Sequence, residues 1–130
     1  MSCAFCDSPP ADPLYADDRC FVVLHEDAAV RGHAMVVWRG HVENLSDLGD
    51  DDARHLLDVC RTAERALLAV TGVERAVILK LGIQTPHLHL HIYPVSAKLD
   101  RAAVQEIIDA KTRDEVEADF AEKVRERMRE

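Results

Sequence analysis

Hydrophobic and polar residues alternate strictly between Pro86 and Pro94, where the sequence reads Pro-His-Leu-His-Leu-His-Ile-Tyr-Pro. This pattern is typical of a β-strand with one buried face, because successive side chains of a strand point to opposite sides. The aliphatic members of the alternation are expected to enter the core: Leu88, Leu90 and Ile92. The other face is expected to carry a row of three imidazoles: His87, His89 and His91.

Three other short segments, rich in β-branched and aliphatic residues, predict further strands at residues 19–24, 33–38 and 75–81. The first two are separated by the turn at residues 25–32 and are expected to pair in an antiparallel manner. The third is followed by a short turn at residues 82–86, so its expected antiparallel partner is the histidine strand.

Residues 50–71 predict one long amphipathic helix, because apolar residues recur there at helical spacing and three aspartates lie at its N-terminal end. Gly72 is expected to end this helix. His55 lies beside charged positions and is expected at the surface rather than in a ligand set. Beyond residue 95 the pattern is helical again, first around residues 102–108 and then from Arg113, where Thr112 and Glu115 match a capping box.

The order of two strands, a helix and two strands predicts an α+β fold with an antiparallel meander of about five strands, allowing one short N-terminal strand. We expect a single domain over residues 1–130, with a core at about 3–95 and a helical extension at about 96–130. The residues expected to be buried are Leu56, Leu57, Cys60, Leu67, Val77, Leu79, Leu88, Leu90 and Ile92. The packing of Ile107, Ile108 and Phe120 stays open between their own sheet and the site of a partner chain.

Composition is ordinary for a globular protein, with 48% hydrophobic and 31% charged residues, and no apolar segment approaches the length of a membrane span. The N-terminus has no basic or apolar region typical of a signal peptide, so a cytoplasmic location is expected. The net charge of −8 argues against binding to nucleic acid polymers or anionic membranes. An anionic small molecule would need local positive groups, for which Arg31, Lys80, His33, His89 and His91 are candidates.

The row of histidines has three possible interpretations. An ordinary solvated strand face would normally carry Thr, Lys, Glu and Ser. Alternate histidines on a strand can also bind one zinc ion. In the third interpretation one imidazole attacks phosphorus while its neighbours hold the phosphate oxygens, since neutral imidazole is a competent nucleophile near pH 7. The last two interpretations are compatible with each other.

The N-terminal segment contains a Cys-x-x-Cys pair, Cys3 and Cys6, which is followed by Pro9 and Pro10. A redox pair usually follows a strand and opens a helix, where its pKa is lowered. No strand is predicted before Cys3, so zinc is favoured over redox chemistry, although two thiolates are half of a tetrahedral site. Two unligated thiols near a chain end stay possible on this local evidence.

Together, the segment His87-Leu-His-Leu-His-Ile-Tyr93 and the order of elements resemble the histidine triad (HIT) family, over roughly residues 3–95. Three further places support the resemblance. The Gly32-His33 pair before a hydrophobic strand matches the Gly-His strand start of the family, and the segment from Arg39 through His41 to Leu45 looks like the segment before its helix. Cys3-Ala-Phe-Cys6 is similar to the CxFC of the zinc-carrying bacterial branch.

The resemblance implies hydrolysis or transfer at the α-phosphate of a nucleotide through a nucleotidyl-histidine intermediate. The implied nucleophile is His89, the middle histidine. His91 would contact the phosphate oxygens, and His33 would lie near the nucleophile. Gln84 and Thr85 occupy the turn that contacts the phosphate and leaving group in the family.

In the zinc branch, two thiolates are joined by an upstream histidine and by the first histidine of the motif. The ligand set that this implies is Cys3, Cys6, His41 and His87. A structural zinc ion would then hold the N-terminus against the histidine strand and keep His87 out of the reaction. Its removal should damage folding as well as activity.

Two positions depart from the family pattern. His25 stands where many relatives carry the Asp or Asn that binds ribose, and Glu26 or Asp27 would have to substitute through a remodelled turn. Lys80 stands where many relatives have an Asn near the phosphate. His25, Asp27 and Lys80 are therefore candidate substrate-binding residues, while the base and the nucleotide itself rest on the family analogy.

The leading hypothesis is a zinc-stabilised hydrolase of a nucleoside phosphate derivative, such as a phosphoramidate, a dinucleoside polyphosphate or an adenylylated product. One alternative is a nucleotidyl transferase of the same mechanism. Another is a nucleotide-binding or interaction module with incidental activity. The resemblance also implies a homodimer that pairs through the long helix and neighbouring strands.

Overall fold

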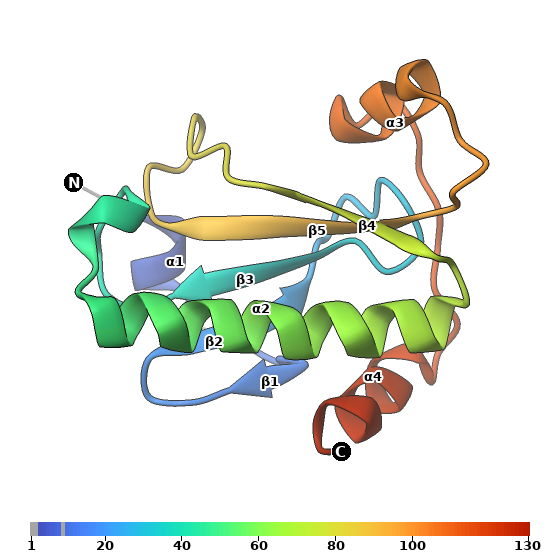
Figure 1. Cartoon of the computed structure of the whole chain (residues 1–130). Coiled ribbons are helices and arrows are strands. Elements are labelled where there is room, and N and C mark those ends of the chain that lie inside the picture. The colour runs from blue at the N-terminus through green and yellow to red at the C-terminus, as the bar shows by residue number, and fades with distance from the viewer. Residues whose placement is uncertain (1–2, 9) are drawn as a thin grey trace.

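Five strands form one antiparallel sheet in the order β1-β2-β3-β5-β4, as Figure 1 shows. The strands are β1 Tyr15–Ala16, β2 Cys20–Leu24, β3 Ala34–Trp38, β4 Arg75–Leu79 and β5 His89–Val95. The predicted α+β fold with about five antiparallel strands is confirmed, including the short N-terminal strand. The computed structural model describes residues 3–8 and 10–130, so Pro9, which follows the cysteine pair, lies outside the described residues.

The histidine strand β5 lies inside the sheet, between β3 and β4. Its antiparallel register places His91 opposite Met35 of β3 and opposite Leu79 of β4. Both backbone edges of an inner strand are hydrogen-bonded to neighbouring strands, which fixes the direction of its side chains. The predicted pairing with the segment at residues 75–81 is confirmed, with β4 itself ending at Leu79.

The two faces of β5 separate as the alternation predicts. Leu88 and Ile92 are fully buried in the main core, which lies between the sheet and α2, and Leu90 packs against that core while half-buried. The histidines are on the opposite face, yet they are also largely buried, with exposed fractions of 1%, 6% and 8% for His87, His89 and His91. They are covered by the N-terminal segment, by the loop after β4 and by the C-terminal extension.

The long helix α2, Asp50–Thr71, crosses one face of the sheet and has the bounds that the sequence predicts (Figure 1). Gly72 ends it with a φ of 75°, the left-handed conformation that glycine adopts without a Cβ clash. The buried stripe of α2 consists of Leu56, Val59, Cys60, Ala63, Ala66 and Leu67.

The predicted burial of Leu57 is wrong, since its exposed fraction is 61%. One residue along a helix turns the side chain by about 100°, so Leu57 falls on the stripe that also carries Arg61 and Glu64. Val77 and Leu79 are half-buried instead of buried. They lie on β4, the edge strand of the sheet, where only one side of the strand is covered by a neighbour.

His55 is more enclosed than its charged neighbours suggest, because 25% of its side chain is exposed and its Nε2 lies 2.7 Å from Asp17 Oδ2. Asp17 also accepts hydrogen bonds from the Tyr15 hydroxyl and from the backbone amides of Arg19 and Cys20. The carboxylate therefore ties the β1–β2 turn to α2. These bonds hold the pKa of Asp17 well below its usual range against the opposing effect of burial.

The C-terminal extension contains α3, Arg101–Ile108, and α4, Phe120–Met128. The predicted capping box of Thr112 and Glu115 is wrong, because α4 begins only at Phe120. Thr112 Oγ1 donates to the carbonyl oxygen of Ala29 at 2.7 Å, and the Asp114 amide donates to that of Ala28 at 2.8 Å. These bonds to the turn after β2 compete with helix formation, so residues 111–117 have no regular secondary structure.

The extension packs on its own chain at two places, which answers the question left open by the sequence. Phe120, Val124 and Met128 are buried in the main core beside α2. Ile107 packs in a second cluster with Ala29, Tyr93 and Val95. In Figure 1, α4 lies against the C-terminal half of α2, while α3 lies on the side of the sheet away from α2, above the C-terminal part of β5.

Gly32 marks the point where the extension meets the sheet. Its φ is 87°, and a Cβ atom there would lie 3.0 Å from Thr71, 3.2 Å from Phe120 and 3.3 Å from Pro94. Only glycine allows this close approach between the turn, α2 and α4. The remaining short helices are α1, Ala4–Asp7, and a 3-10 turn at Leu45–Asp47. Within residues 3–8 and 10–130, no helix combines the length and apolarity needed to cross a membrane.

Candidate active site and metal centre

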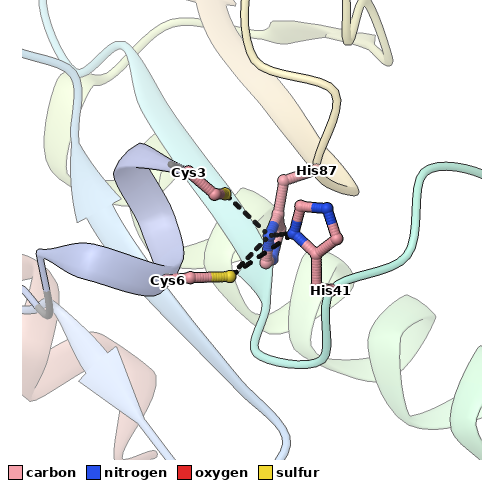
Figure 2. Close-up of side chains that lie close together, drawn as sticks. All are labelled: Cys3, Cys6, His41 and His87. Carbon is pink, nitrogen blue, oxygen red and sulfur yellow. Dashed lines mark hydrogen bonds between the residues drawn. The ribbon is translucent and has the colours of Figure 1, made fainter. Parts of the chain in front are cut away.

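Four potential zinc ligands from three separate segments converge beside the start of β5 (Figure 2). Two thiols come from the segment around α1, one imidazole from the loop after β3, and one from the residue two positions before β5. They are Cys3, Cys6, His41 and His87. The structure thus brings together the whole ligand set that the resemblance implied.

The separations of the ligand atoms suit a tetrahedral ion. Sγ of Cys3 lies 3.3 Å from His87 Nδ1, and Sγ of Cys6 lies 3.4 Å from His41 Nδ1 and 3.5 Å from His87 Nδ1. The two Nδ1 atoms are 3.2 Å apart. Bonds of about 2.3 Å to sulfur and about 2.0–2.1 Å to nitrogen place tetrahedral ligands about 3.3–3.6 Å apart. The residues therefore fit zinc, which would be held by two thiolates and two imidazoles.

A backbone contact sets the orientation of His87. Its Nε2 lies within hydrogen-bonding distance of the carbonyl oxygen of Trp38, so Nε2–H is the donor and Nδ1 keeps its lone pair for a metal. Loss of hydration and the neighbouring Cys3 thiol raise the pKa of Cys6. A bound cation has the opposite effect on a thiol, since its charge favours the thiolate.

A hydrogen bond to the backbone determines which ring nitrogen of His89 carries the proton. Nδ1–H donates to the carbonyl oxygen of His87 at 2.6 Å, which leaves the lone pair on Nε2. Burial lowers the pKa of His89, and the Lys80 ammonium adds a smaller effect in the same direction. The ring is therefore neutral near pH 7, with an unprotonated nitrogen as the candidate nucleophile.

Two further imidazoles form a hydrogen-bonded pair beside His89. His33 Nε2 and His91 Nδ1 are 3.0 Å apart, and the rings of His89 and His91 have centroids 5.0 Å apart. Burial, with smaller repulsion from neighbouring histidines, lowers the pKa of His33 to about 3 and that of His91 to about 4. When His33 donates in this pair, Nε2–H of His91 is available as a donor to an anion.

A pocket of about 550 Å³ lies over these rings, within the range of small-molecule sites. His25, Asp27, Gln84 and Thr85, which the sequence singles out as candidate substrate-binding residues, all line it together with the three imidazoles His33, His89 and His91. Its opposite wall comes from the C-terminal extension, with Ile107 and Ile108. The arrangement brings a neutral nucleophile, hydrogen-bond donors and an apolar wall into one cavity.

The HIT domain matches residues 8–98, which is most of the chain. The chain belongs to the HIT domain family. An uncharacterised HIT-like protein of Borreliella burgdorferi is 25% identical over 103 residues, covering 71% of this chain and 74% of that protein.

Solved HIT structures share the fold. A zinc-bound histidine triad family protein from Mycobacterium smegmatis superimposes with a TM-score of 0.74 at 22% identity, covering 99% of this chain and 94% of that one. A hypothetical histidine triad nucleotide-binding protein from Sulfolobus tokodaii gives a TM-score of 0.67 at 19% identity, with 98% and 87% of the two chains covered. The predicted membership of the HIT family is confirmed.

The structure differs from the HIT-based expectation at Lys80. This side chain is not among the residues that line the pocket, and its ammonium lies 3.4 Å from Asn44 Oδ1. Side chains point to alternate faces along β4 and the residues that follow it. This alternation directs Lys80 toward the loop before α2. Its charge still acts on His89, as described above, without a direct place in the pocket.

Several pocket residues escaped the sequence reasoning. The ring of Phe5 lies 4.8 Å from that of His89, and Tyr93 stacks on His33 with ring centroids 4.2 Å apart. Phe5 lies inside the Cys-x-x-Cys motif and Tyr93 continues the histidine alternation, so both had a local signal. Ile107 and Ile108 had none, because their contact with the pocket depends on how the extension folds back.

Proposed function

We propose that this HIT protein hydrolyses a nucleoside phosphate derivative at the α-phosphate, through a covalent intermediate on His89. The observation that carries the proposal is the hydrogen bond from His89 Nδ1 to the carbonyl oxygen of His87, because it leaves Nε2 unprotonated toward the pocket. A neutral imidazole held in one tautomer on an inner strand is a positioned nucleophile.

The proposed reaction has two displacements. In the first, His89 Nε2 forms a bond to the α-phosphorus, and the bond from phosphorus to the leaving group breaks. The leaving group takes up a proton from solvent in the open pocket. In the second, water attacks phosphorus and gives up one proton to solvent, the phosphorus–nitrogen bond breaks, and His89 returns to its neutral form. Dividing one difficult displacement into two lowers each barrier.

The neighbours of His89 have separate roles in this scheme. His91 donates from Nε2 to the phosphate oxygens, and the hydrogen bond with His33 orients it. Gln84 and Thr85 lie on the loop after β4, at the side of the pocket where the leaving group would be held. Developing negative charge on the oxygens strengthens these bonds in the transition state.

Zinc at Cys3, Cys6, His41 and His87 is proposed to be structural. When bound, it supplies positive charge that holds the two thiolates and joins the N-terminal segment to the strand that carries His89. Phe5 lies between the two cysteines in the sequence and its ring contacts His89, so a zinc ion bound there would help to hold this contact. All four protein ligands are accounted for, so the site has no open position for substrate.

The organic part of the substrate is proposed to lie against the extension. Ile107 and Ile108 give that side of the pocket an apolar wall, while His25, Glu26 and Asp27 supply polar groups at its edge. A nucleoside has this combination of a flat apolar base and a polar sugar. No carboxylate stands at position 25, so Asp27 is the proposed contact to the sugar hydroxyls.

Exposed apolar side chains on α2 and β4 support a homodimer. Leu57 and Ile78 have exposed fractions of 61% and 40%, on the two elements through which the resemblance implied pairing. Burying both would remove apolar surface from water at about 25 cal/mol per Å².

The deciding experiment is mass spectrometry of the intact protein after rapid quenching from adenosine and guanosine phosphate derivatives. A nucleotidyl adduct that peptide mapping places on His89, and that is absent in His89→Ala, supports the hydrolase. Release of the adduct by water alone separates hydrolysis from transfer, which would require a phosphate acceptor. Tight nucleotide binding with neither adduct nor turnover would instead support the binding module.

A further inference from the structure

The chain has 3 phenylalanines, and Phe5 differs from the other two in what its ring contacts. Phe120 is fully buried in the main core, and Phe21 is 4% exposed, with the guanidinium of Arg39 over its ring. Phe5 is only half-buried, belongs to neither hydrophobic cluster and lines the pocket. Its ring therefore packs against the candidate site and not in the core.

The Phe5 ring contacts two members of the histidine row. Its centroid lies 4.8 Å from that of His89, with the ring planes tilted by 56°, and 5.5 Å from that of His87 in an edge-on arrangement. Aromatic rings at such separations and tilts attract each other beyond the burial of their surfaces. On the other side of His89 along the strand, the His91 ring has its centroid at 5.0 Å. Phe5 and His91 therefore confine the His89 ring from two sides.

This confinement adds what the backbone hydrogen bond of His89 does not provide. The bond from Nδ1 to the carbonyl oxygen of His87 holds one atom of the ring. The terminal torsion of a histidine side chain has broad, roughly two-fold preferences, so one bond does not hold the ring plane tightly. A flat ring packed beside the imidazole restricts the same torsion by contact. The direction of Nε2 therefore depends on the Phe5 contact as well as on the bond.

The short helix α1 presents Phe5 to the start of β5 (Figure 1). Its turn is closed by local bonds, because the Cys3 amide donates to Asp7 Oδ2 at 3.0 Å and the Asp7 amide donates to the carbonyl oxygen of Cys3 at 2.8 Å. No residue of α1 itself is fully buried. The contacts of this segment with the histidine row are made by the Phe5 ring and by the two thiols.

We infer that Phe5 is a positioning residue for the nucleophile, because its ring holds the His89 imidazole in the plane that directs Nε2 into the pocket. The orientation follows from the ring contacts alone, whereas its effect on the reaction rests on the proposed function. Misplacement of a reacting group by about 1 Å can lower a rate about hundredfold. The organic part of the substrate is proposed to lie against Ile107 and Ile108, so Phe5 acts on the rate of adduct formation and not on nucleotide affinity.

The test compares Phe5→Ala, Phe5→Leu and Phe5→Tyr in the full-length protein with one zinc ion per chain, using adenosine 5′-phosphoramidate as the probe. In quenched single turnovers, Phe5→Ala should form the His89 adduct about 10- to 100-fold more slowly, with KM changed less than about threefold and the zinc retained. Phe5→Tyr keeps the flat ring and should react as the wild type does. Phe5→Leu keeps only the apolar bulk and should stay slow. Ser8→Ala, an exposed replacement at the end of α1, is the control.

The orientation of His89 is measured without substrate, from the NMR chemical shifts of its two ring nitrogens at one fixed neutral pH. The wild type and Phe5→Tyr should show a single tautomer with the proton on Nδ1, and Phe5→Ala should show a mixture of tautomers. A single unchanged tautomer in Phe5→Ala would overturn the inference, as would an undiminished rate of adduct formation.

Two further outcomes separate positioning from a purely structural role. Equal recovery in Phe5→Leu and Phe5→Tyr would show that α1 needs only an apolar anchor, and loss of zinc in Phe5→Ala would assign the residue to the metal centre. Either result would overturn the positioning role. Absence of any adduct in the wild type would remove the proposed function, and the shifts of the ring nitrogens would still decide whether Phe5 orients His89.

Discussion

The guanidinium of Arg31 donates hydrogen bonds to both carboxylate oxygens of Glu117, at distances of 3.0 and 2.8 Å. Arg31 lies in the turn between β2 and β3, and Glu117 lies in the irregular stretch before α4. This paired contact therefore joins the turn that carries His25 and His33 to the segment that follows the apolar wall of the pocket.

Glu117→Gln should loosen that segment. The ion pair is partly exposed, so its loss should cost less than about 1 kcal/mol of global stability. We expect faster amide hydrogen exchange in residues 100–117 and a rise of about two- to tenfold in KM with little change in kcat, because the wall contributes binding more than chemistry. Glu126→Gln, an exposed replacement on α4, is the control. Equal exchange rates in the two variants would show that the ion pair does not hold the extension.

His89→Ala should lower the turnover rate by several orders of magnitude while nucleotide binding is retained within a few fold. The ring supplies the bond to phosphorus, whereas the surrounding pocket supplies most ground-state contacts. Steady-state rates and calorimetric binding to a non-hydrolysable analogue measure the two quantities. Wild-type turnover in a folded His89→Ala protein would return the histidine row to a binding role.

His41→Ala should lose the bound zinc and lower the melting temperature by several degrees, at about 3–5 °C per kcal/mol for a chain of this size. Three ligands remain, but an open and partly exposed site binds structural zinc weakly. Metal analysis and thermal melts of protein purified without chelator provide the measurement. His55→Ala serves as the matched removal of a histidine in the metal analysis only, since it also breaks the contact with Asp17. Retention of stoichiometric zinc in His41→Ala would contradict the assigned ligand set.

Stability should fall as the pH is lowered from about 6.5 toward 4. The pKa values of His33 and His91 are lowered to about 3 and 4 in the folded protein, below the value of about 6.5 in an unfolded chain. In that window the unfolded chain binds more protons, so each such ring removes up to about 1.4 kcal/mol of stability per pH unit.

Urea unfolding of the wild type and of His33→Gln across this pH range isolates one of the two rings. The variant should show a shallower dependence, by up to one proton. Parallel curves for the two proteins would mean that His33 titrates normally in the folded state.

Leu57→Arg should convert the proposed dimer into monomers, because it puts a charge at the exposed apolar side chain of α2 that the proposed interface would cover. Sedimentation velocity at micromolar concentration measures this. Leu45→Arg changes another exposed leucine, with an exposed fraction of 47%, outside α2 and β4 and should leave the assembly intact. A monomeric wild type would exclude the dimer at that concentration.

The parts of the fold that were predictable depend on local signals. The period of two in β5 separates Leu88 and Ile92 from the histidines without any knowledge of the sheet. The aspartates and Gly72 mark both ends of α2 because helix ends have their own chemistry. Leu57 shows the limit, since its burial depends on which stripe of the helix the sheet covers.

Local signals predicted less of the candidate site than of the fold. The ligands of the proposed zinc site are separated by up to 84 residues, and only the family resemblance connected His41 and His87 with the thiols. Thr112 carried a valid local capping signal, but the carbonyl of Ala29 offers its hydroxyl a tertiary partner instead. Lys80 occupies the position that the family pattern places near the phosphate, but its side chain points away from the pocket.

The two walls of the pocket differ in how freely they can change during evolution. The histidines lie on β5, whose backbone is bonded on both sides, so a change of backbone there would disturb three strands at once. Ile107 and Ile108 belong to an extension that contributes no strand to the sheet. Substitutions between residues 99 and 117 can therefore reshape the apolar wall while the imidazoles keep their positions, and related chains can acquire new ligand preferences through this segment alone.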